Sequence, residues 1–501
     1  MFKKLLSFLL AAVMLFTVAQ TGAAAYAEEA KKSDVTPVVV VPGIGSSALY
    51  SYPNTVHQGS PITIDDTLFN AVSDTHITGD LLRIMAGAKV EPKTFINKLS
   101  AVTRSLRSLN CDENGNSVGN IGIDCYWTDS LANHLDYLDS RSTAEPAVCK
   151  IICDNIGAEN VWLFNYDFRM DVVEDADQLA EFISDVKIQS GHDKVTLVSA
   201  SLGTSVVSAY IDRYKSRNDI KRTVFLDGAF QGTSVGKLFK KELIIDEDEI
   251  NNYIDLLAAC YVADTIDFGS IQKVFSMFDG TVSNLVEFLN ELSSEENIDA
   301  LYTEVVLPLL GNIPSLWECI PYDDFDEALE MMLELGAVKV GSGLFEKITR
   351  YHDIQGRLEE NLKSLQEKGV EIAIVCGYGL PQMPFTSLAG NQSDMLIDTC
   401  YASFGATTAD AGEKVENATS PDGCIDASTC KFENNIWFIK GVQHMEFVYG
   451  TNVNEFVGYL ATTGDALNVK SVAEATEYTK YMGINSDYVM SSITEDRKSV
   501  V

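Results

Sequence analysis

The sequence predicts an α/β protein in which a mostly parallel sheet is covered by helices on both faces. Short apolar runs rich in β-branched residues alternate along the chain with longer segments of helical character. The apolar runs are continuous, as is typical of strands buried on both faces. Ligands of such sheets bind beyond the carboxyl ends of the strands. Strands are expected at 37–41, 160–164, 195–200, 223–226, 370–376 and 436–439.

The segments between these strands are of two kinds: a single helix, and one long interval with several helix-forming stretches. A helix is expected over 174–188, where acids come first and apolar residues recur at helical spacing. The interval from Asp227 to Val370 is too long for a simple connection. It holds acidic helix-forming segments and apolar clusters, and we expect a cap or lid inserted at about 233–365 into one domain over 28–501. A separate small domain is the alternative for this interval.

Residues 1–27 have the pattern of a secretory signal peptide. Lys3 and Lys4 precede an almost wholly apolar run over 5–16, and Ala-Tyr-Ala at 25–27 is a small-x-small cleavage site. The apolar run is too short to span a bilayer comfortably, and no later segment is long and apolar enough to be a transmembrane helix. We therefore expect a secreted or cell-surface protein.

The charge balance limits the classes of partner. The chain has 72 acidic and 37 basic residues, which gives a formal net charge of −35. Such an acidic surface argues against nucleic-acid binding and against electrostatic docking on anionic membranes. Transient contact with a lipid surface stays open, and no stable protein partner is predicted.

Ten cysteines are present, an even number that permits several disulfides in an exported protein. Cys424 with Cys430, or Cys111 with Cys125, would close small loops, and the sequence leaves the connectivity open. The spacing of cysteines and histidines does not resemble a zinc site, so no metal and no cofactor is predicted.

The most informative stretch is a strand that reaches a serine and continues directly as a helix. Residues 195–200 are apolar and β-branched, Ser201 follows, and small and apolar residues continue from Leu202. This is the layout of a nucleophile elbow, in which the serine hydroxyl stands clear of the sheet. In the usual pattern G-x-S-x-G, Ser199 replaces the first glycine and Gly203 is the last. The alternative is an ordinary strand-to-helix turn with hydroxyls for capping.

A serine nucleophile needs a base, and the base needs an acid that orients it. In hydrolases with this elbow the chain order is serine, acid, histidine. His444 is the one histidine beyond the strand at 370–376. The acid should follow that strand, where Asp394 is the first choice and Asp398 the reserve. Asp227, which follows the strand after the elbow, is a further candidate.

Two backbone N–H groups should stabilise the negative charge on the reacting carbonyl oxygen. One is expected from Leu202, directly after the serine. The other is expected from Ile44 in the turn at 41–47, where glycines allow the backbone to bend toward the site. A dinucleotide-binding loop is excluded for this turn, because the G-x-G-x-x-G spacing is missing.

Several motifs occur in the order found in the lecithin:cholesterol acyltransferase-like α/β-hydrolases, a family that includes lysosomal phospholipase A and phospholipid:diacylglycerol acyltransferases. The chain resembles that family at 39–49 (V-P-G-x-x-G-S-x-L), at 134–139, at 166–169 (Y-D-W-R), at 313–322 (P-S-L-W) and around Asp394 (D-G-T-V). Met395 stands where the family has the glycine of D-G-T-V. Ser199 and the 227–232 segment also depart from the family pattern, so the substrate pocket is expected to differ.

The resemblance implies the α/β-hydrolase fold and a serine acyl-enzyme mechanism on lipid esters. It assigns catalytic roles to Ser201, Asp394 and His444, and oxyanion roles to Ile44 and Leu202. The hypothesis is a secreted esterase, lipase or O-acyltransferase for phospholipid or acylglycerol-type esters, with water or a second alcohol as acceptor.

Three other functions stay open: a catalytically silent exported binding protein, an esterase of non-lipid substrates, and a secreted peptidase. A further alternative concerns Asp167 and Arg169 of the 166–169 motif. In the alternative interpretation, the motif has a purely structural role, and these two side chains form a buried pair behind the oxyanion turn.

Overall fold

A computed structural model gives the fold of the chain. The described residues are 35–493 except 46, 48, 52–59, 62–75, 120, 124–126, 140–144, 244, 249, 252–280, 384–391, 411, 412, 445–451 and 485–488. The predicted signal peptide, Cys125, Cys260 and part of the predicted cap therefore lie outside the described residues. None of the helices in the described ranges combines the length and the apolar character that a membrane span requires.

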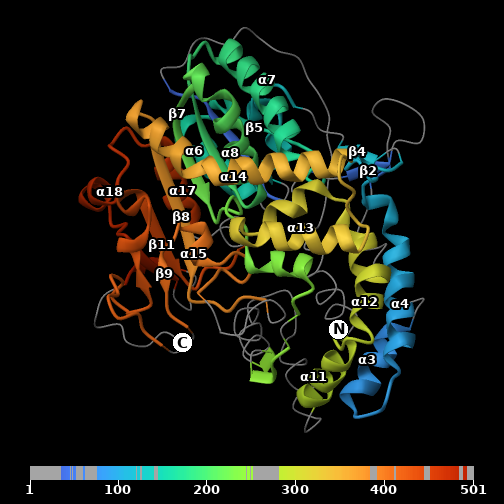
Figure 1. Cartoon of the computed structure of the whole chain (residues 1–501). Coiled ribbons are helices and arrows are strands. Elements are labelled where there is room, and N and C mark those ends of the chain that lie inside the picture. The colour runs from blue at the N-terminus through green and yellow to red at the C-terminus, as the bar shows by residue number, and fades with distance from the viewer. Residues whose placement is uncertain are drawn as a thin grey trace.

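An eight-stranded sheet forms the centre of the molecule (Figure 1). Its order is β13-β12-β11-β8-β7-β6-β1-β5, and the edge pair β12–β13 is antiparallel while the other pairs are parallel. The strands are β1 Val38–Val41, β5 Val161–Leu163, β6 Val195–Ala200, β7 Ile220–Leu226, β8 Glu371–Tyr378, β11 Ile436–Lys440, β12 Tyr481–Ile484 and β13 Met490–Ser492. The mostly parallel α/β architecture is confirmed, and each of the six predicted strands is present.

Both faces of the sheet are buried, which explains the continuous apolar runs. In β1, Val39 and Val41 belong to one hydrophobic core, whereas Val38 and Val40 belong to the core on the opposite face. The first core contains residues of α7, α8 and α14, and the second contains residues of α6 and α17 (Figure 1). These helices are α6 Glu145–Ile156, α7 Val172–Ser190, α8 Leu202–Tyr214, α14 Gly343–Glu367 and α17 Asn452–Thr462.

Helix α7 illustrates how the sequence sets the bounds of these elements. The Asp171 side chain caps its first turn by accepting the Val173 N–H at 3.0 Å. Gly191 ends it with a φ of 69°, a left-handed conformation that glycine adopts without steric cost. The predicted helix over 174–188 is therefore confirmed and extends by two residues at each end.

The segment between β7 and β8 has a hydrophobic core of its own, which includes Trp317, Phe325 and Leu344. Its last helix, α14, packs against α8 and joins the segment to the sheet. The Tyr351 hydroxyl of α14 donates to the Phe230 carbonyl at 3.3 Å. The elements here are η5 Ser234–Lys240, α11 Thr281–Leu292, α12 Ile298–Leu301, η6 Tyr302–Gly311, η7 Pro314–Cys319, η8 Tyr322–Asp324, α13 Phe325–Glu334 and α14.

The remaining elements lie around the sheet and this segment. Helices α3 and α4 pack against α11 and η6. These elements are β2 Leu49–Ser51, β3 Ser60–Pro61, α3 Ile77–Met85, α4 Pro92–Ser105, η1 Arg107–Leu109, β4 Ile121–Ile123, η2 Leu131–Asn133, α5 Leu135–Asp139, η3 Ala158–Asn160, η4 Lys215–Arg217, α15 Thr399–Ala402, β9 Thr407–Thr408, β10 Ile425–Asp426, η9 Ala427–Thr429, η10 Glu433–Asn435 and α18 Val469–Ala475.

The eight described cysteines are free thiols, so Cys424 and Cys430 are not bonded to each other. The Cys430 side chain is buried in the first core, whereas the Cys424 thiol lies 4.0 Å from the Asp422 carbonyl oxygen. Cys111 is also free, and its suggested partner Cys125 is outside the described residues.

Three buried acids lie where η7 meets the start of α7. Burial, followed by the negative charges of Asp171 and Asp175, raises the pKa of Glu318 well above its ordinary value. Burial likewise raises the pKa of Asp171 and of Asp175. One carboxyl oxygen of Glu318 and one of Asp175 have no hydrogen-bond partner among the described residues. The folded protein therefore holds protons here that the unfolded chain releases.

We expect the contribution of Glu318 to the free energy of unfolding to fall as the pH rises above 4.5, the ordinary pKa of a glutamate, because the folded state keeps this proton to higher pH than the unfolded state. Glu318→Gln should weaken this pH dependence, since the amide is neutral at every pH. Thermal unfolding across the pH range measures it, with exposed Glu304→Gln as the matched control. An unchanged slope in Glu318→Gln would show that Glu318 is ionised in the fold.

Candidate active site

Ser201 occupies a sharp turn between β6 and α8. Its φ of 50° and ψ of −127° lie outside the regions that non-glycine residues favour. Hydrogen bonds fix this backbone: the Ser201 N–H donates to the Leu226 carbonyl at 3.0 Å, and the Ser201 carbonyl accepts from the Thr204 hydroxyl at 2.6 Å. A strained residue that its surroundings hold in place is typical of functional sites. The turn also has the strand-to-helix form predicted from the sequence.

The turn after β1 packs directly on the Ser201 turn. A Cβ atom at Gly203 would lie 2.3 Å from the Val41 carbonyl oxygen and 2.4 Å from that of Pro42. A Cβ atom at Gly43 would lie 2.9 Å from the Ser201 Cβ. Both positions therefore require glycine, and the two turns are held in contact.

A chain of two hydrogen bonds runs from Ser201 to a buried acid. His444 Nε2 lies 2.9 Å from Ser201 Oγ, and His444 Nδ1 lies 2.6 Å from Asp394 Oδ2. Because a carboxylate only accepts, Nδ1 carries the proton and Nε2 is left to accept from the serine hydroxyl. The His444 N–H also donates to the Asp394 carbonyl at 2.9 Å, which ties the two loops together. The structure thus brings together the three residues that follow β6, β8 and β11.

Asp394 is fully buried, and its charge is compensated locally. Its Oδ1 accepts the N–H groups of Leu396 at 2.9 Å and Ile397 at 2.6 Å. Burial alone would raise the pKa of Asp394, but His444 and these hydrogen bonds hold it below its ordinary value. Met395 has a φ of 80°, a left-handed conformation that glycine adopts most readily. This is the position that was compared above with the glycine of the D-G-T-V motif. This turn brings the following N–H groups back to the carboxylate.

The reserve acid, Asp398, does not contact His444 and instead binds Ser234 and Gln382. Its carboxylate accepts the Ser234 hydroxyl at 2.7 Å, the Ser234 N–H at 2.7 Å and the Gln382 side-chain amide at 2.9 Å. Asp398 therefore fastens the start of η5 to the loop after β8. Both ring nitrogens of His444 are already engaged by Ser201 and Asp394, so Asp398 is not the partner of the imidazole.

The third candidate acid, Asp227, lies close behind the other two groups. One ligand atom from each of Asp227, Asp394 and His444 lies within 4.8 Å of the others. Such a cluster has ligand types that suit a metal. Each ring nitrogen of His444, however, already has a hydrogen-bond partner. The arrangement therefore favours proton transfer over metal binding.

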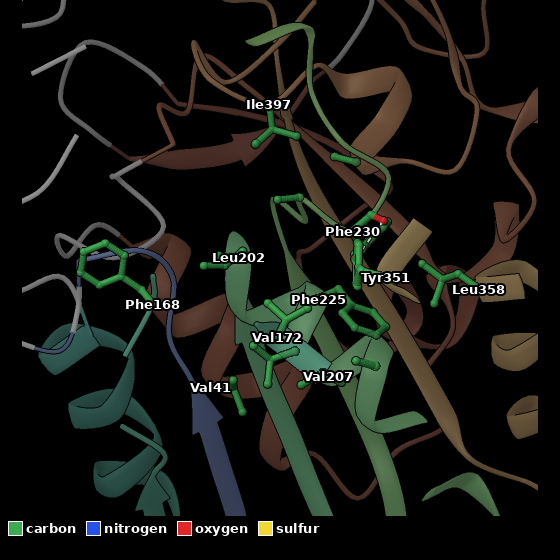
Figure 2. Close-up of a cluster of buried hydrophobic side chains, with 14 of the residues drawn as sticks. Val41, Phe168, Val172, Leu202, Val207, Phe225, Phe230, Tyr351, Leu358 and Ile397 are labelled. Atoms are coloured by element: carbon green, nitrogen blue, oxygen red, sulfur yellow. Dashed lines mark hydrogen bonds between the residues drawn. The ribbon is translucent and has the colours of Figure 1, made fainter. Parts of the chain in front are cut away.

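The predicted oxyanion donors belong to the two turns that meet at Ser201. Leu202 is the first residue of α8 and is fully buried, and Ile44 follows Gly43 in the turn that packs on Ser201. Figure 2 shows Leu202 and Val41 among the side chains of the first core. Within the described ranges, neither N–H donates to a protein acceptor. The first N–H groups of a helix have no partner inside it and favour negative charge.

Tyr166 supports the turn after β1, whereas Arg169 ties its own loop to the segment before β4. The Tyr166 hydroxyl donates to the Pro42 carbonyl at 2.7 Å, a contact that the sequence did not indicate. Arg169 is buried and donates from Nε and Nη2 to the Asp167 carboxylate at 2.9 and 2.6 Å. Its Nη1 also donates to the Leu109 carbonyl at 3.2 Å. Asp167 and Arg169 thus form an ion pair in which Arg169 is buried and Asp167 is half-buried, which agrees with the pairing in the structural alternative for this motif.

Comparisons with known proteins add little to this geometry. No protein-family model matches the chain. No curated protein is significantly similar to it in sequence. Among solved structures, a chain from "The crystal structure of Tle4-Tli4 complex" aligns with a TM-score of 0.34 and 11% identity, over 84% of this chain and 96% of that chain. A TM-score this low carries no argument about fold or function.

We expect Gly203→Ala to lower the free energy of unfolding by about 2 kcal/mol, because the new methyl group overlaps two carbonyl oxygens of the turn after β1. Gly79→Ala in α3 is the matched control. No atom lies within 4 Å of a Cβ at Gly79, and alanine should stabilise the helix by about 0.5–1 kcal/mol. Denaturant unfolding measures both. Equal effects of the two variants would contradict the close approach of the two turns.

Proposed function

We propose that this protein is a serine hydrolase or acyltransferase of the α/β-hydrolase type, which cleaves esters through an acyl-enzyme on Ser201. The observation that carries the proposal is the continuous relay from Ser201 through His444 to Asp394, with hydrogen bonds of 2.9 and 2.6 Å. The strained turn at Ser201 supports the proposal, as do the N–H groups of Leu202 and Ile44, which have no protein acceptor among the described residues.

The reaction begins when His444 Nε2 takes the hydroxyl proton and Ser201 Oγ attacks the ester carbonyl carbon. Asp394 stabilises the imidazolium that forms, and the N–H groups of Leu202 and Ile44 bind the oxyanion. His444 then gives its proton to the leaving alcohol, and the C–O bond breaks. Water or a second alcohol, deprotonated by His444, attacks the acyl-enzyme and restores Ser201.

Lipid esters are the proposed substrate class, and this part rests on the resemblance to the lecithin:cholesterol acyltransferase-like family. Within the 166–169 motif that carries part of this resemblance, the Tyr166 hydroxyl fastens the turn after β1, where the proposed donor Ile44 lies. Secretion is likewise proposed from the sequence of residues 1–27. An esterase of non-lipid substrates, a peptidase and a silent binding protein are the outcomes that the assay below separates from this proposal.

We expect purified protein to release p-nitrophenol from its esters, and Ser201→Ala to lower turnover by about 10⁴-fold or more, because the nucleophile is lost. Ser184→Ala is the matched control, since Ser184 donates to the Ala180 carbonyl on α7, away from the relay. The ratio of long-chain to short-chain ester turnover tests the lipid class. A folded parent with no turnover of esters or amides would favour the binding protein, and amide turnover alone would favour the peptidase.

A further inference from the structure

Asp227 is a buried acid at the end of β7 for which the relay leaves no role. Its N–H donates to the Val375 carbonyl of β8 at 2.9 Å, so its backbone is fixed between two central strands. Its Oδ1 accepts the Gly377 N–H at 2.6 Å. Its Oδ2 is buried and has no hydrogen-bond partner among the described residues. One carboxyl oxygen is therefore satisfied and the other is not.

The unsatisfied oxygen belongs to an acid that lies beside the Asp394 carboxylate. One ligand atom of each acid lies within 4.8 Å of the other, and both side chains are almost completely buried. After burial, the negative charge of Asp394 is the largest cause that raises the pKa of Asp227. Two negative charges this close in the interior cannot both persist without a cation, so one of the pair holds a proton.

The hydrogen-bond partners decide which acid holds the proton. Asp394 accepts from Leu396, Ile397 and His444, whereas Gly377 is the one donor to Asp227 within the described part of the chain. Three donors stabilise the ionised form of Asp394. Burial, followed by the charge of Asp394, raises the pKa of Asp227 well above its ordinary value.

Besides Asp394, two titratable groups lie close to Asp227. One ring nitrogen of His444 lies within 4.8 Å of an Asp227 carboxyl oxygen, but the two ring nitrogens are engaged by Asp394 and Ser201, so the ring does not donate to Asp227. The other group is the Cys376 thiol. Burial, followed by Asp227, raises the pKa of the Cys376 thiol well above its ordinary value. Cys376 therefore supplies no charge that would favour an ionised Asp227.

We propose that Asp227 is a neutral carboxylic acid whose Oδ2–H donates to the Asp394 carboxylate and so positions it for His444. The inference rests on the proposed function, since it assigns a positioning residue to that same relay. A neutral donor fixes the acid without adding a second negative charge beside the imidazole. Asp227, which the sequence offered as a further candidate for the acid of the relay, thus serves as a hydrogen-bond donor to the acid Asp394.

The test compares two variants of Asp227 by the rate at which a fluorophosphonate labels Ser201 as a function of pH. Asp227→Asn keeps the shape, the neutral charge and a donor toward Asp394, whereas Asp227→Ala removes the donor. We expect Asp227→Asn to keep the acid-limb midpoint of the parent. Asp227→Ala should label about tenfold or more slowly than Asp227→Asn, the loss expected for a hydrogen bond to a charged group.

A shift of the Asp227→Asn midpoint to lower pH would overturn the proposal. Removing an ionised Asp227 would take a negative charge from beside His444, and the imidazole would then lose its proton more readily. An infrared difference spectrum of the parent minus Asp227→Asn gives an independent reading: it should contain one C=O stretch of a protonated carboxyl group that the variant has lost. If the parent is not labelled at any pH, the proposed function fails, and the infrared band alone decides the protonation of Asp227.

Discussion

The buried negative charge of Asp394 is the constraint on which the site depends. A carboxylate without water is costly, and this one is stabilised by the two N–H groups that follow it and by the imidazole of His444. Those N–H groups reach it because the chain turns left-handed at Met395. The same carboxylate fixes the ring of His444 so that Nε2 faces Ser201. Removing the charge would therefore leave the base without its orientation, although the sheet itself would be unchanged.

The sheet supplies the rigidity that this arrangement requires. Strands β6, β8 and β11 each lead into a segment that carries one member of the relay, so three distant segments of the chain meet at one edge. Close backbone contacts then hold the strained conformation of Ser201. Gly203 lies against the turn after β1, and Gly377 lies against Asp394, where a Cβ would come within 2.8 Å of the aspartate Cβ. Stability and chemistry therefore depend on the same few glycines.

Much of the fold and the chemistry could be predicted from the sequence, because the strands are visible as apolar runs and the candidate residues occur in the order serine, acid, histidine. Apolar runs predicted the six inner strands, and a serine between a strand and a helix predicted the sharp turn. The strands β12 and β13 were missed because neither contains a run of β-branched residues: β12 reads YMGI, and β13 carries two serines. Asp394 and Asp398 could not be separated by spacing alone, since the left-handed Met395 decides which of them faces His444. The neutral state proposed for Asp227 could not be predicted from the sequence, because it follows from the short distance between Asp227 and Asp394 in the fold. An isolated glycine in β8 was the one sequence sign of the close approach there.

Ester turnover by Asp394→Asn and Asp398→Asn tests the central claim, that Ser201 acts through an imidazole held by one particular buried carboxylate. The two substitutions remove a charge from buried acids four positions apart. The account predicts that Asp394→Asn lowers kcat by about 10⁴-fold, because the amide favours the wrong tautomer of His444. Asp398→Asn should keep turnover in the folded protein and lower its Tm. Equal losses of kcat in the two variants, or a larger loss in Asp398→Asn, would contradict the relay.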